Sequence, residues 1–210
     1  MPMSRYIHNL ILQGENQHLD FKFEISDAKK IARSFSAFAN TDGGTLLIGV
    51  KDNGNIAGVR TDEEVYMAES AAKLYCRPPV DFKIVPHRVN EKRILEIIVP
   101  ESHLKPHYVP WKDNKWKAFV RVNDQNFIAD EVLMRVWKLK TGKNKLLVRY
   151  DSFEEKLLAL LRTKQEITLD DFLVSCKIKP YLAVKILANL ISIDIVAYRI
   201  TESKTYYYLK

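Results

Sequence analysis

The sequence predicts an α+β protein with a mostly antiparallel sheet and flanking helices, followed by a smaller domain of helices and a hairpin. Two observations predict the sheet: an alternating apolar and polar stretch near residue 20, and two apolar stretches that meet at Asn90-Glu91. A third observation separates the smaller domain, because residues 151–210 carry helix-capping signals. The 210 residues, of which 47% are hydrophobic, suffice for one large core or two small ones.

The strands of the first domain follow from two-residue alternation and from short buried apolar runs. Within His18–Ile25 the alternation places Leu19, Phe21, Phe23 and Ile25 on one face. Further strands are predicted at Thr45–Val50, Phe82–Arg88, Arg93–Val99 and Lys117–Val122. Between them, Asp52-Asn53-Gly54-Asn55 predicts a tight turn of the Asn-Gly kind.

The helices of the first domain follow from their caps and from the 3.6-residue period. We expect a short helix over Ser4–Leu12, and a second helix that Ser26 caps and that runs from Asp27 to about Asn40. The apolar side of this second helix is Ile31, Phe35 and Phe38. A third helix is predicted from about Asp62 to Tyr75, and Asp130–Leu139 is expected to close the domain.

The end of the chain predicts three helices and a terminal hairpin. Ser152 and Thr168 begin capping boxes, and Pro180 begins a helix that runs to about Ile191. Strands are predicted at Val196–Ile200 and Thr205–Leu209. This order is typical of a winged helix-turn-helix. We therefore expect domains at 1–140 and 151–210, joined by a basic linker over 141–150.

The charge of the chain is compatible with a polyanionic partner. The 33 Lys and Arg residues exceed the 26 Asp and Glu residues by 7, and residues 1–150 account for +6 of this excess. No apolar run is long enough to span a bilayer, which excludes an integral membrane protein. Only two cysteines occur, without companions, and no secretory signal is visible, so we expect a cytoplasmic protein.

Several motifs of the first domain occur together. They are Glu15 and Asp20-Phe21-Lys22; Ala37-Phe38-Ala39-Asn40-Thr41-Asp42-Gly43-Gly44; Ile48-Gly49-Val50 with Asp52; Lys105-Pro106-His107; and Phe119-Val120-Arg121-Val122. Over Gly14 to Arg135 the chain resembles the Schlafen-type, Alba-like family, which is customarily labelled DNA-binding and is also described as a divergent AAA or ATP-binding domain. It departs from the family at Asp20, where Glu is usual, and at Asn123, where Gly is usual. No GxxxxGK[ST] motif supports ATP binding.

The resemblance implies nucleic-acid binding, and the adjacent winged helix is similar to many transcriptional regulators, so DNA is expected ahead of RNA. The candidate contact residues are Lys22, Lys29, Lys30, Arg33, Arg121, Lys179, Lys185 and Arg199. Trp111, Trp116 and Trp137 could stack on bases, although packing is the expected role of at least two of them. A homo-oligomer is compatible with the sequence.

A second function is metal-dependent cleavage of structured RNA, which the resemblance implies through three carboxylates at matching positions: Glu15, Asp20 and Asp52. Phosphodiester hydrolysis needs hard oxygen ligands for Mg²⁺ or Mn²⁺, and these side chains could converge if their strands pair. The simpler interpretation is that Asp52 serves the turn and that the other two are solvated. A third function is a protein-interaction module that assembles through the winged helix.

Overall fold

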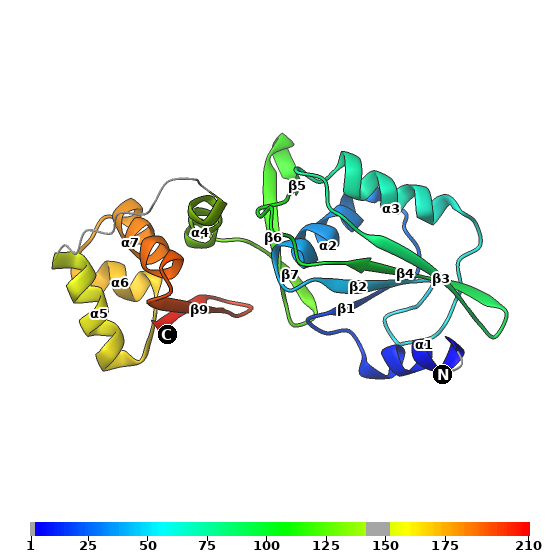
Figure 1. Ribbon diagram of the computed structural model, residues 1–210, viewed down its shortest axis with the longest axis horizontal. Coiled ribbons are helices and arrows are strands. Elements are labelled where there is room, and N and C mark those ends of the chain that lie inside the picture. The colour runs from blue at the N-terminus through cyan, green and yellow to red at the C-terminus, as the bar shows by residue number, and fades with distance from the viewer. Residues whose placement is uncertain (1–2, 142–151) are drawn as a thin grey trace. The chain divides into compact units, whose positions relative to one another are not determined.

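The computed structural model describes residues 3–141 and 152–210 (Figure 1). The chain divides into two compact units, one ending at Ile128 and one beginning at Ala129, and it has the predicted α+β character. No helix in the described ranges is long and apolar enough to cross a membrane.

A four-stranded sheet organises the first unit. Its order is β1 (Leu19–Lys22), β2 (Gly44–Ile48), β4 (Lys92–Val99) and β3 (Lys83–Val89). Only the β1–β2 pair is parallel, so the predicted antiparallel character is confirmed. Asn90 and Glu91 form the predicted turn between β3 and β4, both with positive φ.

Helices cover both faces of this sheet, as Figure 1 shows. On one face, α1 (Met3–Gln13) buries Ile7 against Phe21 and Leu47. On the opposite face, α2 (Ala28–Asn40) and α3 (Glu63–Leu74) pack against Leu46 and Ile48. The predicted apolar side of α2, formed by Ile31, Phe35 and Phe38, is buried there.

A second sheet packs against α2. It contains β5 (Tyr108–Pro110), β6 (Trp116–Val122) and β7 (Gln125–Ile128), with a 3-10 turn η1 (Lys112–Asn114) between β5 and β6. The strand predicted at Lys117–Val122 corresponds to β6. Asn40 of α2 ties the helix to this sheet, because its side-chain amide donates to the carbonyls of His107 and Phe119 while its oxygen accepts from the His107 N–H.

The second unit has the predicted helices and hairpin. The helices are α4 (Glu131–Thr141), α5 (Ser152–Lys164), α6 (Leu169–Cys176) and α7 (Pro180–Ser192). β8 (Glu166–Thr168), which was not predicted, pairs with β10 (Thr205–Leu209), and β10 also pairs with β9 (Val196–Ile200). The capping box between Thr168 and Asp171 is present.

The boundary between the units differs from our expectation, because α4 belongs to the second unit and does not close the first. Val132 and Val136 share one core with α7. Asp130 fixes the start of α4, since its carboxylate accepts from the Leu133 N–H and from the Thr205 hydroxyl. Residues 142–150 of the predicted linker lie outside the described residues.

The segment between β1 and α2 also differs from prediction. The strand ends at Lys22, so Phe23 leaves the sheet and is 49% exposed, while Ile25 joins the core on the α2 side. The residue that caps α2 is Asp27 and not Ser26, because the Asp27 carboxylate accepts from the Lys29 N–H at 2.8 Å. A carboxylate at this position also interacts favourably with the positive end of the helix dipole.

Gly43 makes the turn between α2 and β2 possible. Its φ is +73°, and a Cβ at this position would lie 2.9 Å from the Val99 oxygen and 2.9 Å from the Glu101 nitrogen, both backbone atoms. Gly14 also has a positive φ of +67°, but nothing lies within 4 Å of the place its Cβ would take. Substitution of either glycine would therefore strain the backbone, but only a substitution of Gly43 would also create a steric clash.

We predict that Gly43→Ala lowers the free energy of unfolding by about 2–5 kcal/mol, and that Gly14→Ala lowers it by about 1–2 kcal/mol, since only Gly43→Ala adds overpacking to left-handed strain. Urea denaturation followed by circular dichroism measures both values. Equal losses in the two variants would contradict the close approach of β4 to this turn.

Candidate functional site

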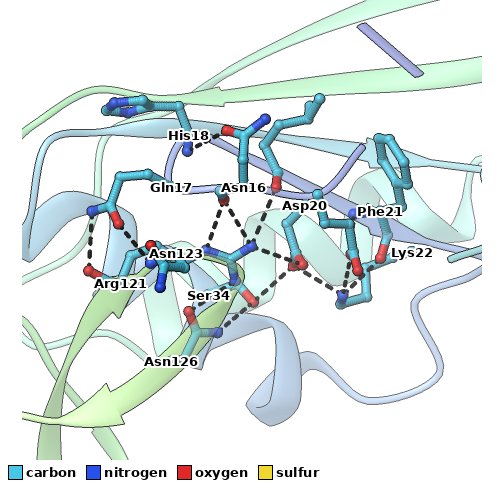
Figure 2. Close-up of polar contacts among 12 residues, drawn as sticks. Asn16, Gln17, His18, Asp20, Phe21, Lys22, Ser34, Arg121, Asn123 and Asn126 are labelled. Carbon is cyan, nitrogen blue, oxygen red and sulfur yellow. Dashed lines mark hydrogen bonds and ion pairs between the residues drawn. The ribbon is translucent and has the colours of Figure 1, made fainter. Parts of the chain in front are cut away.

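The guanidinium of Arg121 lies at the centre of a polar network between β1 and β6 (Figure 2). Arg121 is only 2% exposed. Its Nη2 donates to the carbonyls of Asn16 and Leu19, each at 3.2 Å, and its Nη1 donates to the Asn126 side chain at 3.1 Å. Its Nε also donates to the Asn16 carbonyl at 3.3 Å, and its Nη2 forms an ion pair with Asp20 at 3.3 Å. Arg121 therefore neutralises charge inside the fold, in place of the predicted contact with nucleic acid.

Asp20 points from β1 toward α2 and is 3% exposed. Its second oxygen lies 2.9 Å from the Lys22 ammonium and 3.5 Å from the Ser34 hydroxyl. Lys22 also donates to the carbonyl of Phe21 at 2.6 Å. The structure thus brings Asp20, Lys22 and Arg121 together, with both cations paired to the Asp20 carboxylate.

Glu15 lies beside this network. It accepts a hydrogen bond from the Phe21 N–H at 2.8 Å, and its carboxylate is 3.9 Å from the Lys22 ammonium. Burial and the neighbouring Asp20 carboxyl raise the pKa of Glu15 above its ordinary range. Two acidic side chains and two cations therefore share this region, and their formal charges cancel.

Asp52 does not join the other two predicted carboxylates. It is exposed in the predicted turn, which the Gly54 N–H closes on the Lys51 carbonyl. Across residues 3–141 and 152–210, no group of three or more His, Cys, Asp or Glu side chains is arranged to hold a metal ion. The residues do not fit the expected three-carboxylate Mg²⁺ or Mn²⁺ site, because Lys22 and Arg121 already occupy the oxygens of Asp20.

The predicted cations divide into paired and unpaired groups. Arg121 and Lys22 pair with Asp20, and Arg199 pairs with Glu166 at 3.0 Å. Within the described ranges, the other five make no ion pair: Lys29, Lys30, Arg33, Lys179 and Lys185. The four lysines of this group are exposed, and Arg33 is partly exposed.

Aromatic rings flank two of the three unpaired cations of α2. The Arg33 guanidinium lies 4.5 Å from the centre of the Trp111 ring, and the Lys29 ammonium lies 5.7 Å from the Tyr75 ring. Lys112, which sequence reasoning missed, approaches Trp111 to 5.9 Å. We call Lys29, Lys30, Arg33, Trp111 and Lys112 the α2 surface. The residues of the α2 surface come from two segments that are distant in the sequence, α2 and the β5–β6 hairpin. The surface is therefore recognised only from the contact between these two segments in the structure.

The sequence pattern of the family described as Schlafen, AlbA_2 matches residues 15–130. The chain is similar in structure to the DIP2311 protein from Corynebacterium diphtheriae, with a TM-score of 0.49 and 21% identity over 77% of this chain. It spans only 38% of that protein. A RecG-related protein from Nitrosomonas europaea has an N-terminal domain of similar structure, with a TM-score of 0.42 and 19% identity, covering 72% of this chain and 96% of that domain. No curated protein matches the chain.

We predict that Arg121→Met lowers the free energy of unfolding by about 3–5 kcal/mol, because it leaves the buried Asp20 carboxylate with fewer partners. Arg199→Met is the matched control: it breaks an exposed pair and should cost about 0–1 kcal/mol. Denaturant titration of both variants measures the difference. A small loss for Arg121→Met, similar to that of the control, would contradict a structural role for the network.

Proposed function

The chain belongs to the Schlafen, AlbA_2 family, and from this premise we propose that it is a cytoplasmic DNA-binding protein that regulates transcription. The α2 surface is the proposed contact of the first unit with the phosphate backbone. The observation that carries the proposal is the absence of ion pairs at Lys29, Lys30 and Arg33 within the described residues, which leaves their charge available to an external anion.

Electrostatics support this assignment. Neutralising phosphates releases condensed counterions, and this release supplies much of the affinity of proteins for DNA. The net charge of +6 over residues 1–150 adds long-range attraction to the local contacts. The acidic side chains nearest the predicted metal position are, by contrast, neutralised inside the fold, so cleavage of RNA is not proposed.

For the second unit we propose a winged helix-turn-helix that reads sequence. The order α5, β8, α6, α7, β9 and β10 supports this proposal, with α7 as the recognition helix. Lys179 and Lys185 are exposed near the start of α7. Arg199 on β9 pairs with Glu166 and therefore contributes less positive charge than the sequence implied.

We predict that Lys29→Ala and Lys30→Ala weaken binding to any duplex DNA, and that each lowers the slope of log affinity against log salt by about one unit. Fluorescence anisotropy with labelled random-sequence duplexes measures both effects. Lys73→Ala is the control, since Lys73 already pairs with Glu69. Binding that does not change with salt, or equal losses in all three variants, would contradict the proposed contact.

For the second unit we predict that Lys179→Ala and Lys185→Ala each reduce discrimination by about 1–3 kcal/mol, because each substitution removes a hydrogen bond to a base edge. Selection from random duplexes would first identify a preferred site, and competition against random DNA would then measure discrimination. Arg199→Ala is expected to change it little. If selection enriches no sequence, or if neither lysine variant affects discrimination, the second unit serves assembly and not sequence reading.

A further inference from the structure

Two arginine–tryptophan stacks lie on the β5–β6 hairpin. Arg33 of α2 stacks on Trp111 at 4.5 Å, and Arg77, which follows α3, stacks on Trp116 at 4.0 Å. In each stack the arginine comes from outside the hairpin and the tryptophan from the hairpin itself. Arg77 is brought to the hairpin by its backbone, which exchanges hydrogen bonds with Tyr108 in both directions.

The two stacks lie on opposite faces of the hairpin. Val109 and Phe119 point toward α2 in the main core, and Trp111 packs against Phe119 with ring centres 5.3 Å apart. Trp116 pairs with Pro110, one residue out of phase with Val109, so its side chain points to the other face. One arginine is therefore fixed on each face.

Both guanidinium groups keep their N–H edges uncommitted. No acceptor among the described residues takes a hydrogen bond from the side chain of Arg33 or Arg77. The Nε of Arg33 is buried, so an external anion would meet Arg33 at the edge formed by its two terminal nitrogens. Stacking uses the flat face of a guanidinium and leaves its edge free for a bidentate contact with an anion. The same stacking covers one face of each tryptophan, which reduces its use as a platform for bases.

We propose that Trp111 and Trp116 are positioning residues that hold Arg33 and Arg77 as forks for phosphate groups. The ligand class is a phosphodiester backbone that is recognised without regard to its bases. This inference rests on the proposed function, because it specifies which part of a nucleic acid the first unit contacts.

The first test compares a labelled single-stranded oligonucleotide with an abasic strand of the same length, using fluorescence anisotropy on the full chain. We expect the two affinities to agree within about twofold. Base stacking contributes about 1–3 kcal/mol per base, so stacking on either tryptophan would weaken abasic binding by about fivefold or more. A loss of that size would overturn the inference.

The second test uses Arg33→Lys and Arg77→Lys, which keep the charge and remove the planar fork. Each is expected to weaken binding by about two- to fivefold, as is Trp116→Leu. Arg88→Lys is the matched control, because Arg88 is exposed on β3 and stacks on no tryptophan. Thermal unfolding measurements check that each variant is folded. At Trp111 the substitution is Trp111→Phe, because Trp111 packs against Phe119 and a smaller side chain would disrupt the core more.

The double variant Arg77→Lys with Trp116→Leu separates positioning from a merely structural role. If Trp116 acts through Arg77, the affinity of the double variant is no lower than that of whichever single variant, Arg77→Lys or Trp116→Leu, has the lower affinity. Additive losses would overturn the inference, as would unchanged binding in both arginine variants while the wild type still binds. If the wild type binds neither strand nor duplex, the proposed function fails together with the inference.

Discussion

Arg121 carries a charge that it cannot lose, and the fold places it where water does not reach. Every acceptor around it must therefore come from the chain, and two of them are the backbone carbonyls of Asn16, just before β1, and of Leu19, its first residue. Gln17 adds to this attachment, because its amide donates to the Arg121 carbonyl and its oxygen accepts from the Asn123 N–H. The start of the four-stranded sheet is thus fixed to the second sheet through the side chains of Arg121 and Gln17, and Asp20 on β1 is paired within the same network.

The network has an electrostatic consequence for the surface. Acidic side chains that lie close to Arg121 and Lys22 are already engaged, so they do not compensate the cations of α2. Two of those cations, Lys29 and Arg33, instead lie against aromatic rings, which attract positive charge without neutralising it. Lys22 and Arg121 thus pair with acidic side chains inside the fold, whereas the cations of α2 keep their charge available to an external anion.

The sequence predicted the regular elements better than the roles of their side chains. Period-two alternation and capping residues identified β3, β4, β9, β10 and the helices, because each signal is local. Strands of three residues such as β5 and β8 carry too little pattern to be recognised. Arg121 was predicted to contact nucleic acid, since alternation cannot say which face of a strand a second sheet or a helix will cover. Asp52 was grouped with Glu15 and Asp20 on motif resemblance, and sequence proximity to a strand end could not establish whether the three side chains meet.

The placement of α4 bears on how this chain can be recombined. The family pattern ends at residue 130, yet Asp130 bonds to Thr205 and α4 shares its apolar side chains with α7. A chimera that keeps residues up to Thr141 and replaces the rest of the chain would retain α4 but lose α7, against which α4 packs. If the part after Thr141 were moved to another protein, it would lack α4, and the side chains that α4 covers would be exposed. A junction between Ile128 and Ala129 keeps each core whole, so the exchangeable module begins one helix earlier than the basic stretch of the sequence would suggest.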